Sequence, residues 1–232
     1  MANLHYLADS GFVASGETGP RQDAPENWVV WHFTHRDNLQ GIVADNALFP
    51  STVRTPTVNV ANTGIKDRRT MIRVRPDDTY PVATVAEHVP FDIAAKSPML
   101  FVVSKGHEEY RGGTADLVFL GAVLGDIAAS GLTWCVSNGN AAASFTEFSR
   151  HLPALGSFVD FPLLQQRYWN NTPDDMNRMS RRAAELLVLG PLPLSLISIV
   201  AAKTEPVLTR AQAQMSAVGG VRECHVFPQI YY

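Results

Sequence analysis

Two side chains at the end of a strand-like run could hold a sugar or an amide. His32 and Thr34 flank Phe33 at the end of the apolar stretch 28–33, and residues two apart on a strand point to the same side. A ring nitrogen and a hydroxyl on one side can bind a ribose or an amide through hydrogen bonds. The alternative is that His32 is a core histidine whose polar atoms are satisfied by its neighbours.

A carboxylate enters an apolar strand further along the chain. Glu185 lies in the run Arg181–Val188, directly before three aliphatic residues, and glutamate is rarely buried unless it is paired or functional. A fixed carboxylate in a water-poor cleft can stabilise positive charge that develops on a sugar. The alternative is a structural ion pair with a neighbouring arginine.

Two clusters of basic residues could contact phosphates. The segment 66–75 holds five cations and one anion, and a second cluster is formed by Arg178, Arg181 and Arg182. Within the first cluster, Arg69 could bind a pyrophosphate with two parallel hydrogen bonds or polarise a nucleobase carbonyl. Either cluster could instead be a solvated surface, whereas a functional role would be contact with a polyanion.

Several familiar sites are absent from the sequence. It has no glycine-rich phosphate loop ending in lysine, no Gly-x-Gly-x-x-Gly and no Gly-x-Ser-x-Gly. His32 and His35 are three residues apart, but the strand is expected to end between them, and no Asp, Glu or Cys set accompanies them. Asp174 and Asp175 fit an acidic turn better than a cation site. We therefore expect no metal.

The elements that would position these residues indicate an α+β fold. Residues 1–27 are expected to form an irregular N-terminal arm, and 50–80 and 162–182 to form long loops. Strands are predicted at 28–33, 98–104, 117–123, 184–189, 196–202 and 221–227, and helices at 39–46, 141–150 and 209–218. Because strands outnumber helices and do not alternate with them regularly, we predict one α+β domain over residues 1–232.

Composition places the chain among folded globular proteins. Of the 232 residues, 46% are apolar and 18% charged, with a net charge of −3, which excludes disorder over most of the chain and a whole-molecule basic field. The two cysteines cannot form a disulfide scaffold. Because no apolar run reaches the ~18 residues of a membrane span and no signal peptide is visible, we expect a cytoplasmic protein without a membrane partner.

Taken in order, these pieces resemble the DarT-type DNA ADP-ribosyltransferase toxins. The matching stretches are 31–42, 65–69, 88–91, 96–100 and 181–188, so the resemblance spans about residues 28–205. The sequence departs from the family at Asp92, where some members carry an aromatic residue after Val-Pro-Phe. Asp92 has no aromatic ring and therefore cannot supply a stacking contact at that position.

The resemblance implies a fold, an activity and a partner. The fold would be an ADP-ribosyltransferase-like split β-sheet core with flanking helices. The activity would use NAD as co-substrate, without a metal, and attach ADP-ribose to a base in single-stranded DNA, usually thymine. The family also includes a macrodomain antitoxin that removes ADP-ribose from DNA, so the chain would be the toxin of a toxin–antitoxin pair.

The resemblance also assigns residues to roles. His32, Phe33 and Thr34 would hold the nicotinamide riboside, and Gly41 and Phe49 would contact the cofactor further along. Arg69 would be the key arginine, both catalytic and cofactor-binding, although Arg68 beside it leaves the assignment ambiguous by one residue. Glu185 would be the catalytic glutamate. The preceding loop would contact DNA through Tyr168, Trp169, Arg181 and Arg182.

Two other functions remain open from the sequence. An ADP-ribosyltransferase of the same fold could act on RNA or protein. A nucleic-acid-binding module without turnover could use the two basic clusters, and its binding would weaken with salt and be independent of NAD. That second alternative leaves Glu185 unexplained.

Overall fold

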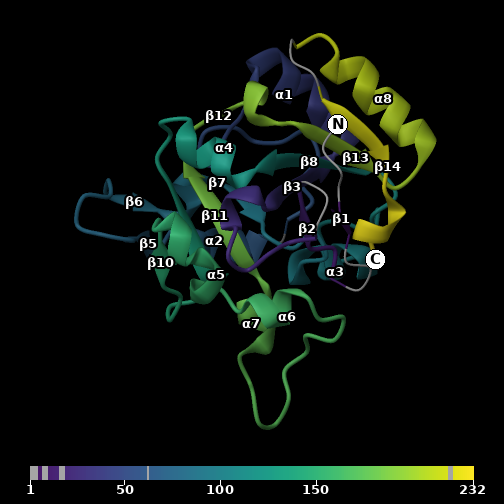
Figure 1. The fold of residues 1–232 in the computed structure, drawn as a ribbon. Coiled ribbons are helices and arrows are strands. Elements are labelled where there is room, and N and C mark those ends of the chain that lie inside the picture. Colours follow the sequence, from purple (N-terminus) through teal and green to yellow (C-terminus); the bar gives the residue numbers. More distant parts are fainter. Residues whose placement is uncertain (1–4, 7–9, 16–18, 62, 219–221) are drawn as a thin grey trace.

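A mixed eight-stranded sheet forms the centre of the molecule (Figure 1). The structure, a computed structural model, describes residues 5–6, 10–15, 19–61, 63–218 and 222–232. In spatial order the strands are β10 (Phe148–Ser149), β9 (Trp134–Asn140), β11 (Ala184–Leu189), β7 (His88–Asp92), β3 (Val29–His35), β8 (Leu117–Val123), β13 (Ile199–Ala202) and β14 (Glu223–Val226). All neighbours are antiparallel except β13 and β14.

The sheet splits between β3 and β7. These two strands share one registered residue pair, Trp31 with Asp92, whereas β3 pairs with β8 along all seven of its residues. Beyond that pair, the strands are joined by a side chain, because His32 contacts the carbonyl of Pro90. The divergence opens one half of the sheet from the other, which agrees with the split sheet that the resemblance implied.

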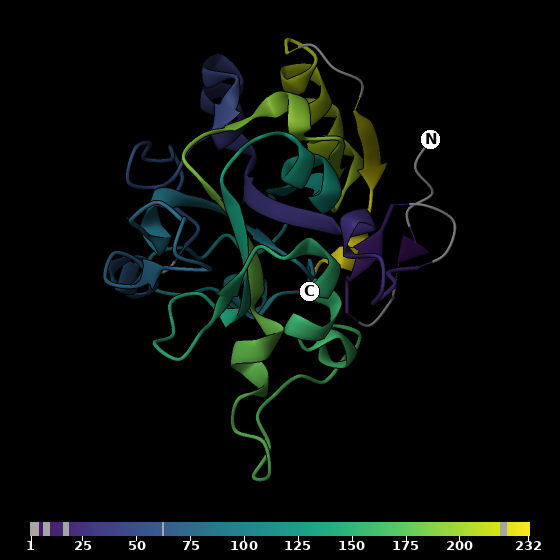
Figure 2. The ribbon, with the colours of Figure 1, turned by 60° about the vertical axis from the view of Figure 1, so that its left-hand side comes forward.

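Helices and short strand pairs surround this sheet (Figures 1 and 2). The helices are α1 (Leu39–Asp45), α2 (Thr63–Arg69), α3 (Pro98–Lys105), α4 (Leu124–Ala129), α5 (Leu155–Phe158), α6 (Phe161–Leu164), α7 (Arg178–Arg182) and α8 (Glu205–Met215). The short pairs are β1 (His5–Tyr6) with β2 (Val13–Ala14), β4 (Ala47–Leu48) with β12 (Leu192–Pro193), and β5 (Arg73–Val74) with β6 (Ala83–Thr84). The chain between α6 and α7 extends away from the body in both views.

Both faces of the sheet are covered by apolar side chains. Because successive residues of a strand point to opposite faces, Val30 of β3 packs into one core cluster and Trp31 into another. The described part of the 1–27 segment is irregular apart from its short elements, yet it contributes to the core. Phe12 is fully buried and contacts Trp28 and Phe161 edge-on, at 5.4 Å between ring centroids in each case.

The strand predicted at 98–104 is wrong, because this segment forms helix α3. Ser97 caps the helix, its hydroxyl accepting a hydrogen bond from the Leu100 amide at 3.2 Å, and Pro98 occupies the first turn. Serine followed by proline is a helix-start signal, and here it outweighs the β-branched pair Val102–Val103.

The helix predicted at 141–150 is also wrong. The segment turns and then forms the edge strand β10, with Phe148 paired with Ser137 of β9, while Phe145 is exposed instead of facing a core. The two predicted long loops need smaller corrections. The 50–80 loop contains α2 and β5, whose partner strand β6 follows the loop, and the 162–182 loop includes most of α6 and all of α7.

Candidate active site

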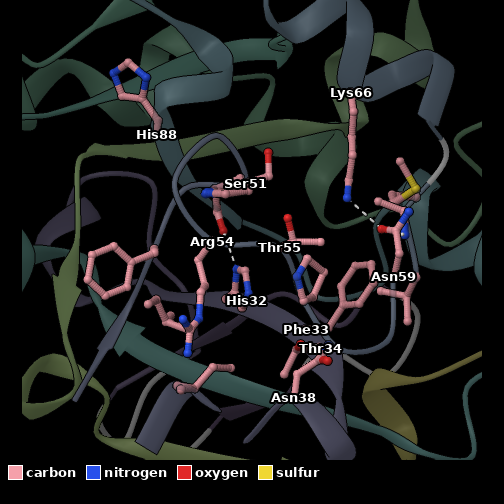
Figure 3. Close-up of a pocket in the computed structure, with 18 of the residues that line it drawn as sticks. His32, Phe33, Thr34, Asn38, Ser51, Arg54, Thr55, Asn59, Lys66 and His88 are labelled. Atoms are coloured by element: carbon pink, nitrogen blue, oxygen red, sulfur yellow. Dashed lines mark hydrogen bonds between the residues drawn. The ribbon is translucent and has the colours of Figure 1, made fainter. Parts of the chain in front are cut away.

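A cleft of about 720 Å³ lies where β3 and β7 diverge. Its size falls within the ~300–1,000 Å³ typical of small-molecule sites. The lining side chains come from β3, α1, the 47–61 segment, α2, β7, α3 and β11. Figure 3 shows His32, Phe33 and Thr34 of β3 on one side, and Lys66 directed toward Asn59 on another. Residues distant in sequence therefore meet in one cavity.

His32 lies in the cleft as a neutral ring with a defined tautomer. Its Nδ1 is 2.9 Å from the carbonyl oxygen of Pro90, and because a carbonyl can only accept, Nδ1 carries the proton. Burial lowers the pKa of His32, partly opposed by that hydrogen bond. The unprotonated Nε2 is therefore left as an acceptor that suits a sugar hydroxyl.

Asn38 connects Thr34 to the opposite wall of the cleft. The Asn38 amide donates to the Thr34 hydroxyl at 3.0 Å and to the Val58 carbonyl at 2.9 Å, and its Oδ1 accepts from the Val58 amide at 2.7 Å. Thr34 accepts in this network, so its own proton remains available for a ligand. Asn38 was not singled out by the sequence, because a lone asparagine at a helix start usually indicates only a cap.

Arg69 and Glu185 form an ion pair in the cleft. Nη1 of Arg69 lies 2.9 Å from Oε2 and 3.2 Å from Oε1 of Glu185. Nη2 of Arg69 is buried and has no hydrogen-bond partner within the described residues. The neighbouring Arg68 is exposed and bonds to the Gly64 carbonyl of its own helix. Helix α2 thus turns Arg69, and not Arg68, toward the glutamate.

A local irregularity of β11 aims Glu185 into the cleft. The register between β11 and β9 shifts between Ala184 and Leu186, and such bulges commonly redirect a side chain. The Glu185 amide donates to the Ser137 hydroxyl at 3.0 Å, and the Ala141 amide donates to Oε1 at 3.3 Å. Glu185 is only 8% exposed, so its carboxylate is held rigidly with little water around it.

A second carboxyl faces the same pair. Asp92 lines the cleft and is the direct cross-strand partner of Glu185. Burial, together with the charge of Glu185, raises the pKa of Asp92 to about 8. In the sequence, this position was noted only as a departure from the family that the chain resembles, because cross-strand register cannot be obtained from one sequence.

His88 closes one side of the cleft with a tyrosine behind it. Its Nε2 is 2.9 Å from the Tyr80 hydroxyl, its Nδ1 is 2.8 Å from the Thr84 carbonyl, and the two rings stack. Burial lowers the pKa of His88 to about 4 and raises that of Cys135, beside Tyr80, to about 12. These groups are neutral at physiological pH and provide a fixed polar wall.

Gly41 and Phe49, predicted to contact the cofactor, both line the cleft. A Cβ at Gly41 would lie 3.8 Å from Nη2 of Arg54, whose Nε pairs with Asp45 at 3.0 Å. On another wall, Lys66 donates to Asn59 at 2.7 Å, and burial lowers its pKa. Lys66 belongs to the basic cluster 66–75 noted in the sequence, whereas Arg54 was not singled out there. Together they add positive charge suited to a diphosphate.

The two aromatic residues predicted to stack on DNA lie in different environments. Tyr168 is 72% exposed on the protruding 165–178 segment, with Arg167 over its ring at 5.4 Å. Trp169 is 6% exposed, and its indole N–H donates to the Tyr232 hydroxyl at 3.2 Å. Tyr168 is therefore free to meet a ligand, whereas Trp169 anchors the base of the segment.

The two arginines predicted to contact DNA are both engaged within the protein. Arg182 is 1% exposed, and its guanidinium donates to the carbonyls of Leu164, Ser10 and Lys96. Burial lowers its pKa to about 10. Arg182 thus joins three backbone segments and cannot reach a DNA phosphate, which corrects that assignment. Arg181, which is partly exposed, pairs with Asp160 and Asp175.

No group of three or more His, Cys, Asp or Glu side chains in the described parts of the chain converges to hold a metal ion. Among the same residues, no helix has the length and apolar character needed to cross a bilayer.

Comparison with known proteins gives consistent similarities. The profile of the family described as "ssDNA thymidine ADP-ribosyltransferase, DarT" matches residues 31–232. A protein of Mycobacterium tuberculosis H37Rv, described as a DNA ADP-ribosyl transferase, is 51% identical over 227 residues, which cover 98% of each chain. A Thermus sp. strain 2.9 protein with the same description is 28% identical over 184 residues, covering 79% of this chain and 85% of that one.

Solved structures are similar to the fold over nearly its full length. Thermus sp. 2.9 DarT in complex with ADP-ribosylated ssDNA superposes with a TM-score of 0.79 at 25% identity, covering 93% of this chain and 99% of that one. The same Thermus protein in complex with NAD+ gives a TM-score of 0.74 at 24% identity, covering 93% and 100%. The latter similarity concerns the fold alone.

Proposed function

Since this chain belongs to the DarT family of DNA ADP-ribosyltransferases, we propose that it transfers ADP-ribose from NAD to thymine in single-stranded DNA. The printed family description names thymidine in ssDNA, and the Thermus relative was solved with ADP-ribosylated ssDNA. The alternative of a binding module without turnover gains no support from these similarities.

The observation that carries the proposal is the Arg69–Glu185 pair inside the cleft that His32 and Thr34 also line. The cavity fits a dinucleotide in its size and in the variety of its polar groups. The unpartnered Nη2 of Arg69 offers a donor for a phosphate or a base carbonyl. Arg54 and Lys66 can also bind the phosphates, and His32 and Thr34 can form hydrogen bonds with sugar hydroxyls.

Glu185 has the central role in the chemistry. Loss of nicotinamide leaves positive charge at the anomeric carbon, and a preorganised carboxylate stabilises such charge most effectively where water is excluded. Ala141 and Arg69 hold the Glu185 carboxylate in one orientation. Arg69 is also close enough to Glu185 to polarise an acceptor placed beside the anomeric carbon. His32 and Thr34 orient the nicotinamide riboside, with Phe33, Gly41 and Phe49 completing the donor site.

The protruding segment before α7 presents the DNA acceptor. Tyr168 is exposed there and can stack on an unpaired base. A single strand is the preferred substrate, because the reacting edge of thymine is paired in a duplex. Transfer to cellular DNA would be toxic, so we propose that the chain is the toxin of a toxin–antitoxin pair, opposed by a macrodomain that removes ADP-ribose. Because the proposed target is cellular DNA, we propose that the protein acts in the cytoplasm.

The central experiment incubates the protein with labelled NAD and a panel of polymers. We expect transfer to thymine-containing single strands, reduced transfer to the matching duplex, and none to strands lacking thymine, with the modified base located by mass spectrometry. Glu185→Gln should abolish transfer in a protein that still folds cooperatively, although loss of the buried ion pair with Arg69 should lower its melting temperature. The exposed Glu108 provides the matched control, and Glu108→Gln should retain full activity.

Four outcomes would contradict the proposal. Undiminished transfer by Glu185→Gln would remove the glutamate from the mechanism. Equal rates on duplex and single strand would exclude the proposed acceptor geometry. Label on RNA or protein, with none on DNA, would favour the alternative acceptor. A macrodomain hydrolase that failed to release label from the modified strand would exclude the proposed antitoxin.

A further inference from the structure

Asp92 is a carboxyl in the cleft to which none of the roles above gives a function. It lines the cavity and is only partly exposed. It forms the sole registered β3–β7 pair, with Trp31, and lies directly across from Glu185 on β11. Directly opposed side chains on neighbouring strands have Cβ atoms about 4.5–5.5 Å apart, so the two carboxyls enter the same part of the cleft.

The proposed reaction has a proton that needs an acceptor. The ring nitrogen of thymine carries a proton and is a poor nucleophile until that proton leaves. Arg69 cannot accept it, because a guanidinium already carries its full set of protons and has no acceptor atom. Glu185 must stay ionised to stabilise the donor sugar, and it is bonded to Arg69 through both oxygens. Of the carboxyls near Arg69 in the described part of the cleft, Asp92 is the one left.

We propose that Asp92 is the base that accepts the ring N–H proton of the target thymine, a role that rests on the function proposed above. In this step the thymine N–H bond breaks and its proton moves to a carboxylate oxygen of Asp92. The nitrogen electron pair forms the bond to the anomeric carbon. The glycosidic bond to nicotinamide breaks with its electron pair moving to the nicotinamide ring, which leaves neutral. Asp92 then loses the proton to solvent.

The surroundings of Asp92 suit a base that works near neutral pH. The charged and titratable groups around it are Glu185 of β11, Arg69 of α2, Arg182 of α7 and Tyr232 of the C-terminal segment. Burial and the Glu185 charge raise the pKa of Asp92 to about 8, while a hydrogen bond with Ser97 and the two arginines oppose this. A base is most effective when its pKa lies near the working pH.

The test compares two acceptor bases in single-turnover transfer with Asp92→Asn. Thymine and 5-bromouracil have similar shapes, but the bromine makes the ring N–H more acidic, so this base needs less help to lose its proton. With thymine, we expect Asp92→Asn to slow transfer by about 10²–10⁴-fold, the usual contribution of a general base. With 5-bromouracil, the loss should shrink by at least about tenfold.

The pH profile gives an independent readout. The wild-type rate on thymine should rise with pH around a midpoint near 8, as Asp92 ionises. In Asp92→Asn this rise should be absent. If that variant melts early, Asp92→Ser with added formate replaces it, because formate can enter the space and restore a carboxylate. The exposed Asp126 supplies the control, and Asp126→Asn should match wild type throughout.

The outcomes separate this role from a structural one and from failure of the proposed function. Equal loss on thymine and 5-bromouracil, or an unchanged pH profile, would overturn the role of Asp92. Failure of formate to restore Asp92→Ser would also overturn it. If wild-type protein labels no thymine strand at all, the proposed function fails, and that result does not depend on any Asp92 variant.

Discussion

Replacing Asn38 with alanine should weaken NAD binding by detaching one wall of the cleft. Two of the three hydrogen bonds of the Asn38 side chain go to the backbone of Val58, at 2.7 and 2.9 Å. Val58 and its neighbours from Pro56 to Val60 line the cavity. Without these bonds, the segment around Val58 is no longer held in place before NAD binds. The free energy needed to order it is then subtracted from the binding free energy, so the affinity for NAD falls.

The magnitude follows from the number of bonds removed. A neutral hydrogen bond contributes about 0.5–1.5 kcal/mol net, so loss of the two bonds to Val58 should cost about 1–3 kcal/mol. At about 1.4 kcal/mol per tenfold, the dissociation constant for NAD should rise by about 5- to 150-fold. The bond to Thr34 is lost as well, so the free energy of unfolding should also fall.

Titration calorimetry with NAD and urea unfolding would measure the two effects. Gln40→Ala is the matched control, because Gln40 is exposed on the same helix, α1, and it should leave the NAD affinity unchanged. An Asn38→Ala protein that bound NAD within about twofold of wild type, with unchanged stability, would refute the claim that Asn38 holds the wall in place.

Three further outcomes are expected. Arg69→Ala should reduce the transfer rate more than it reduces NAD affinity, measured by single-turnover assay and calorimetry, and equal losses would make Arg69 only a phosphate contact. Tyr168→Ala should weaken binding of a single-stranded oligonucleotide by about 1–3 kcal/mol in fluorescence anisotropy. Trp169→Ala should instead lower the free energy of unfolding by about 3–5 kcal/mol. Loss of stability in Tyr168→Ala together with loss of DNA binding alone in Trp169→Ala would contradict the exposure of Tyr168 and the burial of Trp169. Because the pKa of His88 is lowered to about 4, the unfolded chain binds a proton between about pH 6.5 and 4 that the folded chain does not. The free energy of unfolding of wild type should therefore decrease as the pH is lowered through this window. Urea unfolding should show that this decrease is larger in wild type than in His88→Gln by up to about 3 kcal/mol.

The strands that carry the site could be predicted from local pattern. The apolar run ending at Phe33 and the run following Glu185 both form strands, β3 and β11, because β-branched, aromatic and aliphatic side chains favour a buried sheet. Burial of a carboxylate in such a run is energetically costly, and for that reason the sequence alone indicated Glu185 as a candidate. The same reasoning failed at 98–104, where the Ser97 cap decided the structure.

The exposure of individual residues could not be predicted in the same way. Tyr168 and Trp169 are adjacent and aromatic, yet one is exposed and the other bonds to Tyr232, 63 residues away. Arg182 appeared to belong to a basic surface, but it binds carbonyls of residues as distant as Ser10. Sequence shows the type of side chain, whereas exposure depends on the segments that pack around it.

By itself the sequence determined the chemical groups. These are a histidine and a threonine two residues apart on a strand, an arginine that is either Arg68 or Arg69, and a glutamate at the start of an apolar strand. The tertiary structure decided which of these meet. It selected Arg69 over Arg68 through the orientation of α2, and it placed Asp92 opposite Glu185 through the register of β7 and β11. Register and helix orientation are fixed by contacts between distant segments, and for that reason one sequence taken alone could not supply them.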